Sequence, residues 1–233
     1  MAWDKEHTKQ YHTWAHNYPV VITTTILFLL LAITEFLLWS EISIVVRVVS
    51  SVIGASFVVA FGFLCARIIR RISKDILEEG IIFQPRLKPT NRVMFKSNKV
   101  YTLAYKKRIL EQLKKDGAWS QSPQPKDADS ETYIHAIEDA HNHVLEATRL
   151  DVVLFDRNCF YGFARNLFGG LFLNSCITII LMAIVWLDGT DDWMVLLYVL
   201  GIEVLFLILD AFMAYHEGMD YARRLYVAYL ESK

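Results

Sequence analysis

Hydrophobic residues fall into four long runs that are separated by polar segments of very different length. Two runs lie close together at about Val20–Trp39 and Ser43–Ile69, and two more at about Leu167–Leu187 and from Trp193 onward. A helix of about 20 apolar residues spans the hydrocarbon layer of a bilayer. The pattern therefore predicts an all-α membrane protein with four transmembrane helices in two hairpins, joined by a helical cytoplasmic domain.

This pattern divides the chain into five segments. They are an interfacial segment (1–18), a first transmembrane hairpin (19–69), a cytoplasmic helical domain (70–165), a second hairpin (166–215) and a helical tail (216–233). The tail is apolar on several positions of one face, so we expect it to pack on the cytoplasmic domain.

The middle segment contains two amphipathic stretches. Apolar residues that recur every three or four positions predict helices at Asn98–Lys115 and Glu131–Asp151. Prolines in Ile81–Lys96 favour extended chain or short strands there, after a helix that ends at Gly80. The aromatic run Phe155–Gly170 predicts a separate interfacial element before the third membrane helix.

The distribution of charge predicts the orientation in the membrane. The chain is 54% hydrophobic, and its net charge is only −1, with a mean hydropathy of +0.30. Of its 24 Lys and Arg residues, all except Arg47 lie in 1–18, 67–165 or 223–233. By the positive-inside rule, both termini and residues 70–165 face the cytoplasm of a multi-pass protein in the inner or plasma membrane.

Two ionisable residues in the first hairpin are expected to meet. Glu35 and Arg47 each lie six residues from Glu41 in the turn, so both are about 9 Å below it on antiparallel helices. An ion pair between them would lower the cost of placing two charges in lipid. It either fixes the hairpin or takes part in ion conduction. Ser50, Gly54 and Gly62 predict surfaces for close helix packing.

The fourth run carries carboxyl groups at intervals of seven. Glu203, Asp210 and Glu217 share one helix face, and Glu203 lies near mid-membrane. Two interpretations are open: a protonated Glu203 bonded to a neighbouring helix, or a cation-conducting or proton-linked face. Asn174 in the third run is a further polar residue that can bond between helices.

Basic residues cluster after the first hairpin and in the middle segment. Residues 67–115 hold 14 basic and 4 acidic residues. This excess favours contact with anionic lipid headgroups or, alternatively, a small anionic ligand such as a nucleotide. No glycine-rich phosphate loop supports the ligand, and nucleic acid is not expected as a partner. The candidate contacts are Arg67, Arg70, Arg71, Lys74, Lys106, Lys107 and Arg108.

Catalytic chemistry is not predicted. His135, Asp139 and His143 recur every four residues on one helix face, a pattern that can hold a metal. Without a further ligand motif, a solvated polar face is the preferred interpretation. No nucleophile–base pair is evident either. We therefore expect no metal, no cofactor and no enzymatic activity.

Two functions from different classes fit these features. The first is a homo-oligomeric membrane effector or channel-like protein whose cytoplasmic domain controls membrane permeability, a layout also found in bacterial defence proteins. The alternative is a membrane anchor or adaptor that recruits a cytosolic protein partner.

Overall fold

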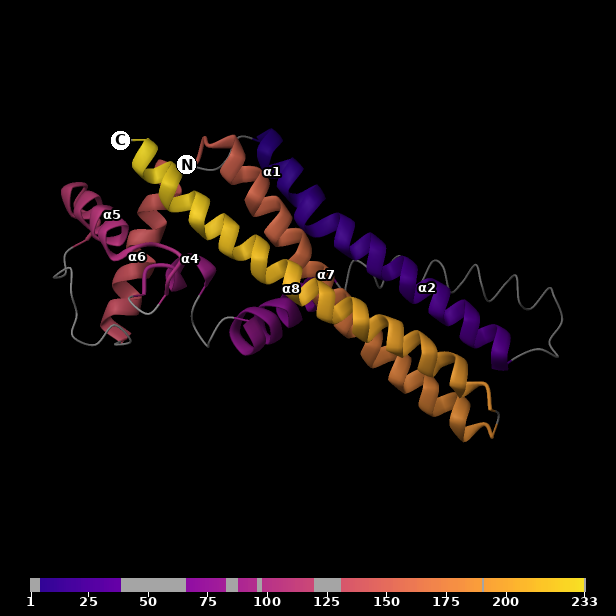
Figure 1. The fold of residues 1–233 in the computed structure, drawn as a ribbon. Helices are drawn as coiled ribbons and strands as arrows, with labels where there is room; N and C mark the ends of the chain where they lie inside the picture. Colours follow the sequence, from indigo (N-terminus) through magenta and orange to yellow (C-terminus); the bar gives the residue numbers. More distant parts are fainter. Residues whose placement is uncertain are drawn as a thin grey trace. The chain divides into compact units, whose positions relative to one another are not determined.

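The chain is helical throughout the part that the structure describes. The computed structural model describes residues 5–38, 66–82, 88–95, 98–119, 131–189 and 191–232, and no strand occurs in them. Residues 66–72 are helical and lead into η2. The other helices are α1 (Lys5–Tyr11), η1 (His12–Asn17), α2 (Tyr18–Leu38), η2 (Ser73–Ile82), α4 (Pro89–Arg92), α5 (Leu103–Lys115), α6 (Glu131–Ala147), α7 (Val152–Leu187) and α8 (Trp193–Glu231) (Figure 1).

Three helices within the described ranges are long and apolar enough to cross a membrane. They cover Glu6–Thr34, Val152–Leu187 and Trp193–Glu231, which indicates a membrane protein. Most of the predicted second span, Ser43–Ile69, lies outside the described residues, which resume at position 66. Four spans and the first hairpin therefore stay predictions.

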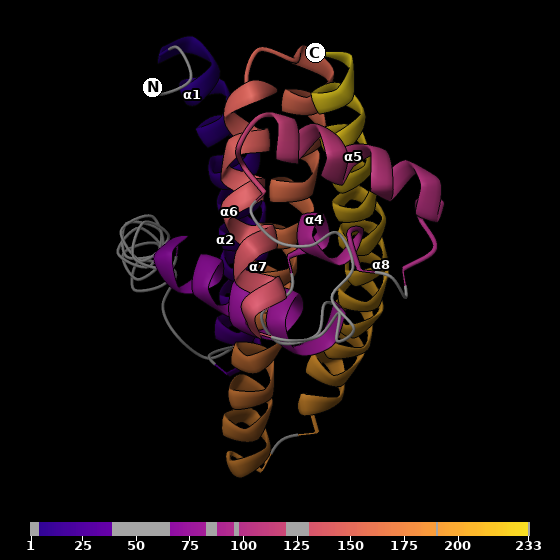
Figure 2. The ribbon, with the colours of Figure 1, turned by 90° about the vertical axis from the view of Figure 1, so that its left-hand side faces the viewer.

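The chain divides into two compact units. Unit 1 consists of residues 1–4, 78–161 and 214–233, and unit 2 of residues 5–77 and 162–213. Helices α7 and α8 each contribute residues to both units. In unit 2 they run antiparallel and side by side, joined by a short turn in which Gly189 has a φ of 79° (Figure 2).

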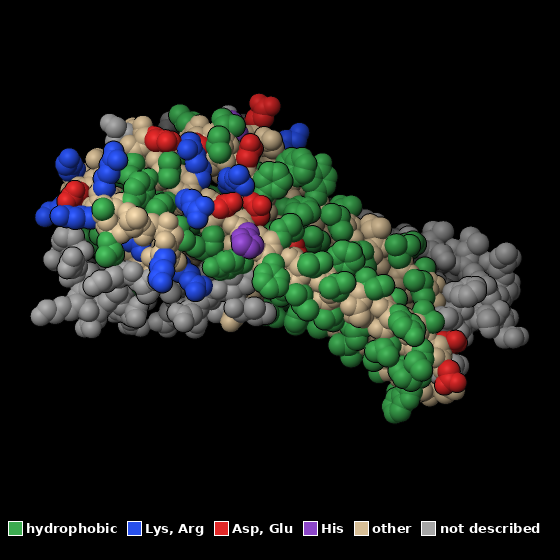
Figure 3. All heavy atoms as spheres, viewed as in Figure 1, with side chains coloured by type: hydrophobic (Ala, Val, Ile, Leu, Met, Phe, Trp, Pro, Cys, Tyr) green, Lys and Arg blue, Asp and Glu red, His purple; other side chains and the backbone are tan. Residues whose placement is uncertain are grey.

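Apolar contacts join α2, α7 and α8 in unit 2. Leu27 and Leu30 of α2 form a buried cluster with Val185 of α7 and Leu196 of α8. Other large apolar side chains on α7 and α8 are exposed, including Trp186, Tyr198 and Phe212. Figure 3 shows hydrophobic side chains covering this hairpin, as expected of a surface that faces lipid.

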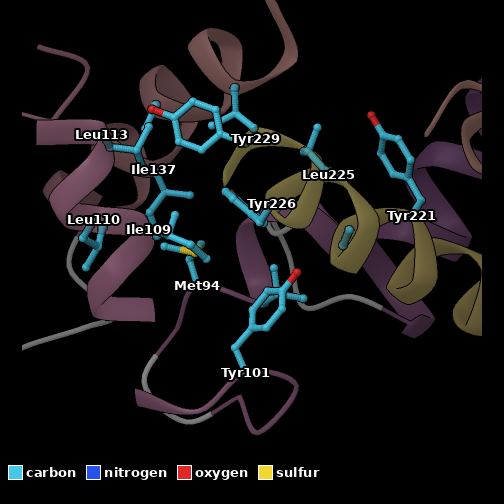
Figure 4. Close-up of a cluster of buried hydrophobic side chains, with 14 of the residues drawn as sticks. Met94, Tyr101, Ile109, Leu110, Leu113, Ile137, Tyr221, Leu225, Tyr226 and Tyr229 are labelled. Atoms are coloured by element: carbon cyan, nitrogen blue, oxygen red, sulfur yellow. The ribbon is translucent and has the colours of Figure 1, made fainter. Parts of the chain in front are cut away.

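The larger hydrophobic core belongs to unit 1. The last turns of α8 bury Leu225, Tyr226 and Tyr229 against residues of α5 and α6, such as Ile109 and Ile137 (Figure 4). This packing confirms the prediction that the apolar tail packs on the middle segment. The two helices predicted in that segment are also confirmed. Helix α5 begins later than predicted, at Leu103, and α6 ends earlier, at Ala147.

Capping explains where the helices of unit 1 begin and end. The Thr102 hydroxyl accepts a hydrogen bond from the Tyr105 N–H at 3.2 Å, so α5 starts at Leu103 and not at Asn98. Gly117, with a φ of 74°, allows the chain to turn after α5.

Three predictions about local structure were wrong. The chain does not leave the helix at Gly80 but stays helical to Ile82, and a helical turn, not a strand, follows at Pro89–Arg92. Proline suits a first helical turn because its missing N–H needs no partner there. The run Phe155–Gly170 is not a separate element either, since it lies within α7. Asp151 caps this helix by accepting the Leu154 N–H at 2.7 Å.

Candidate carboxylate site among the apolar helices

The carboxyl groups of α8 lie on the buried face of this helix in unit 2. Leu196, Glu203 and Asp210 are separated by intervals of seven, and each is no more than 5% exposed. Seven residues are close to two helical turns, so the three side chains point the same way. The acidic residues are therefore turned away from the apolar outer surface of α8.

Glu203 is bonded to the neighbouring helix. The hydroxyl of Thr178, on α7, lies 2.8 Å from Glu203 Oε2 and 3.0 Å from the main-chain oxygen of Asn174. A hydroxyl has one hydrogen to donate and can also accept. It can donate to a charged Glu203, or donate to Asn174 and accept from a protonated Glu203. One arrangement of heavy atoms thus accommodates both charge states.

The polar contacts continue to a third helix. The Asn174 side-chain amide donates to the main-chain oxygen of Thr23, on α2, at 3.0 Å. Thr23 in turn donates its hydroxyl to the Pro19 oxygen at 2.8 Å. Thr23, Asn174 and Thr178 are all buried. These contacts connect Glu203 to α2.

Asp210 differs from Glu203 in having no partner in the described structure. Both of its carboxyl oxygens are buried, and neither has a hydrogen-bond partner among the described residues. Its Cα lies about 10 Å from that of Glu203 along the helix, given 1.5 Å per residue. An unpaired ionisable group in an apolar interior is costly and usually marks a functional site.

Close packing holds α7 against two other segments of unit 2. A Cβ on Gly170 would lie 2.2 Å from the Thr23 methyl carbon, and one on Gly169 would lie 2.4 Å from the Ile69 main-chain oxygen. Only glycine permits these approaches. No pattern in the sequence indicated this role for Gly169 and Gly170. Close packing was predicted instead at Ser50, Gly54 and Gly62, which lie outside the described residues.

The contact between Thr178 and Glu203 could have been predicted from the sequence by comparing how far each residue lies from the turn between α7 and α8. Thr178 lies ten residues before Asp188 (188 − 178 = 10), and Glu203 lies eleven residues after Asp192 (203 − 192 = 11). In an antiparallel hairpin these positions are level. The predicted pair Glu35–Arg47 rests on the same reasoning, but Arg47 and the side chain of Glu35 lie outside what the structure describes.

The predicted basic contacts separate into exposed and buried residues. Arg67, Arg70, Arg71 and Lys74 are exposed in unit 2, and Lys107 and Arg108 are exposed on α5 in unit 1. Figure 3 shows Lys and Arg side chains over unit 1. Lys106 is buried instead, and its ammonium donates to the main-chain oxygens of Phe95 and Asn98. Burial lowers the pKa of Lys106.

The histidine stripe of α6 does not converge on one point. His135 is exposed and lies 3.6 Å from Glu138, whereas His143 faces Asp116 at 3.5 Å. Asp116 also accepts the Tyr229 hydroxyl at 2.7 Å and the Gln112 amide at 3.0 Å. Among the described residues, no group of three His, Cys, Asp or Glu side chains is arranged to hold a metal.

Comparison with known proteins gives no assignment: no protein-family model, no curated protein and no solved structure matches this chain.

Proposed function

We propose that the protein is a channel-like membrane effector in which Glu203 and Asp210 pass protons or other cations across the apolar layer. The observation that carries this proposal is Asp210, a buried carboxyl whose oxygens have no hydrogen-bond partner among the described residues. A carboxyl that served only packing would be expected to have a partner, because burying it without one costs free energy.

Glu203 supports the same function. Its contact with Thr178 suits either charge state, since the hydroxyl can donate or accept. A group that gains and loses a proton without moving its neighbours is suited to a proton relay. The spacing of seven residues places Asp210 two turns further along the same face, where it can act as a second proton-binding group.

The soluble unit is proposed to lie in the cytoplasm and to control this permeability. This placement follows from the charge distribution of the sequence, since 23 of the 24 basic residues lie in 1–18, 67–165 or 223–233. The predicted homo-oligomer is a separate proposal, because both carboxyls are buried within one chain. Molar mass in several detergents, by light scattering, tests it.

Reconstitution into vesicles tests the function directly. Wild-type protein should dissipate a proton gradient followed by an internal pH dye. Asp210→Asn and Glu203→Gln should each slow this about a hundredfold or more, the usual loss when one proton-transfer group is removed. Asp188→Asn, which changes an exposed carboxyl in the turn, is the matched control. Wild-type vesicles as tight as empty ones, or equal rates in all four proteins, would refute the proposal.

The anchor function remains the second candidate. It is favoured by the last turns of α8, which supply buried residues of the unit 1 core. An apolar helix that ends inside a soluble core attaches this core to the membrane. If wild-type vesicles are tight and nevertheless retain a cytosolic protein, the anchor is the better description.

A further inference from the structure

Three segments of unit 2 carry basic side chains at the ends of their apolar runs. His16 lies three residues before Pro19, Arg165 lies two residues before Leu167, and Arg70 directly follows Ile69. Each residue thus lies at the polar border of a helix expected to enter the membrane. Lipid phosphates occupy this depth in a bilayer.

Packing against α7 brings these segments together. The Asn166 amide nitrogen lies 2.5 Å from the Ala15 oxygen and 2.9 Å from His16 Nδ1. One turn further along α7, Gly169 packs against the main chain of Ile69 and the side chain of Ser73. Arg165 precedes Asn166 and lies four residues before Gly169, so α7 holds it between the other two segments.

The electrostatic environment agrees with this placement. The charges of Arg70, Arg165 and His12 all act on the His16 ring, and no carboxylate of the described residues is among the groups that act on it. The nearby Asp75 is paired with Arg71 at 3.5 Å, and no ion pair between Arg70 and another described residue occurs. The Asn166 amide can only donate to His16 Nδ1, so the His16 ring is neutral in this contact, and the charges that repel are those of the two arginines. Two guanidinium groups placed in this way favour an anion beside them.

A buried acceptor lies at the same place. Asn166 is 2% exposed, and its side-chain oxygen has no hydrogen-bond partner among the described residues. Buried acceptors are rarely left without a donor. A headgroup hydroxyl or a water held by a phosphate would supply this donor.

We propose that His16, Arg70 and Arg165 form a binding site for the phosphate of an anionic phospholipid at this border. Arginine binds phosphate through two parallel N–H groups, and basic pockets between membrane helices hold anionic headgroups in this way. The inference is independent of the proposed permeability. It selects Arg70 from the basic residues predicted by the sequence and adds Arg165 and His16, which the sequence did not indicate.

Lipid binding by the full-length, delipidated protein in detergent tests the site. Phosphatidylglycerol should raise the midpoint of thermal unfolding, whereas phosphatidylcholine, inorganic phosphate and glycerol phosphate should not. Arg165→Gln and Arg70→Gln should each weaken the apparent affinity for phosphatidylglycerol about tenfold, as expected for one lost charge-assisted hydrogen bond. Arg71→Gln removes the same charge from an 86% exposed side chain of the same helix and should leave the affinity unchanged.

Native mass spectrometry of the wild-type protein tests the site without any substitution. The protein should retain one anionic phospholipid per chain. If Arg71→Gln weakened the affinity for phosphatidylglycerol as much as Arg70→Gln does, the lipid would be held by general electrostatic attraction to the basic surface. This result would overturn the site. Equal stabilisation by phosphatidylcholine, or by glycerol phosphate, would overturn the assignment to an anionic lipid. Absence of retained phospholipid, together with absence of a shift in the midpoint, would overturn both.

Discussion

The two units differ in the partners of their buried and partly buried carboxyl groups. In unit 1, Asp116 accepts hydrogen bonds from Tyr229 and Gln112, and Glu78 accepts one from Tyr161. In unit 2, Glu203 is bonded to one threonine and Asp210 to no described residue. Paired carboxylates stabilise a fold, whereas unpaired ones cost stability and are kept for another reason. The comparison therefore separates structural acids from candidate functional ones.

Asp151 shows how complete the pairing is in unit 1. It accepts the Leu154 N–H at 2.7 Å and the Arg224 guanidinium at 2.5 Å. Burial by itself would raise the pKa of Asp151, but the Leu154 N–H and the Arg224 guanidinium outweigh burial and lower it. Unit 2 instead depends on apolar contacts and on close approach at Gly169 and Gly170.

The largest expected effect concerns this close approach. Gly169→Ala should lower the stability of the protein by about 3 kcal/mol, because the new methyl group would lie 2.1 Å from Ser73 Oγ and 2.4 Å from a main-chain oxygen. Thermal unfolding in detergent measures the loss. Gly201→Ala is the matched control: it lies on α8 with no atom within 4 Å of the added carbon, and should be neutral or slightly stabilising. Equal effects of the two changes would show that α7 is not closely packed.

A second effect is expected in unit 1, at a buried histidine. His141 on α6 is buried, and its Nδ1 atom has no hydrogen-bond partner among the described residues. Burial, with a smaller contribution from the charge of Lys88, lowers the pKa of His141 from 6.5 to about 4. The unfolded chain therefore takes up a proton between these pH values while the folded protein does not.

This difference predicts that stability falls as the pH decreases from about 6.5 to about 4, by about 3 kcal/mol in total at 1.36 kcal/mol per pKa unit. Unfolding midpoints across this range measure the fall. His141→Leu should flatten the profile, and His135→Leu, which changes an exposed histidine of the same helix, should not. An unchanged slope in His141→Leu would place the pH dependence elsewhere and weaken the comparison between the units.

The smallest expected effect compares one carboxyl from each unit. Asp151→Ala removes a helix cap and a partly exposed ion pair, so it should cost about 2 kcal/mol. Asp210→Leu removes a buried group with no described partner and should be neutral or stabilising. Denaturation of both variants in the same detergent gives the two values. A loss for Asp210→Leu as large as that for Asp151→Ala would reveal a structural role for Asp210.

Local properties of the sequence determined most of the helices. Hydropathy and periodicity identified the apolar helices and α5, α6 and the C-terminal half of α8, because helix formation and amphipathic burial depend on neighbours within a few turns. The same periodicity placed Glu203 and Asp210 on one face of α8. Local signals failed at Gly80 and at Phe155–Gly170, where a break was expected and the helix continues. In α7, contacts with other segments, such as those of Gly169 and Gly170, outweigh the weak preference of glycine and aromatic residues against helix.

With the exception of Thr178, whose depth matches that of Glu203, the partners of the polar groups were decided by tertiary structure alone. No periodicity in α8 indicates that Glu203 meets Thr178, or that Asp210 meets no described residue. The burial of Lys106 and the convergence of His16, Arg70 and Arg165 likewise depend on segments that are far apart in the sequence. The reason is physical: hydrophobicity is a property of each residue, whereas a hydrogen bond or a shared anion site needs two groups within about 3 Å, which only packing achieves.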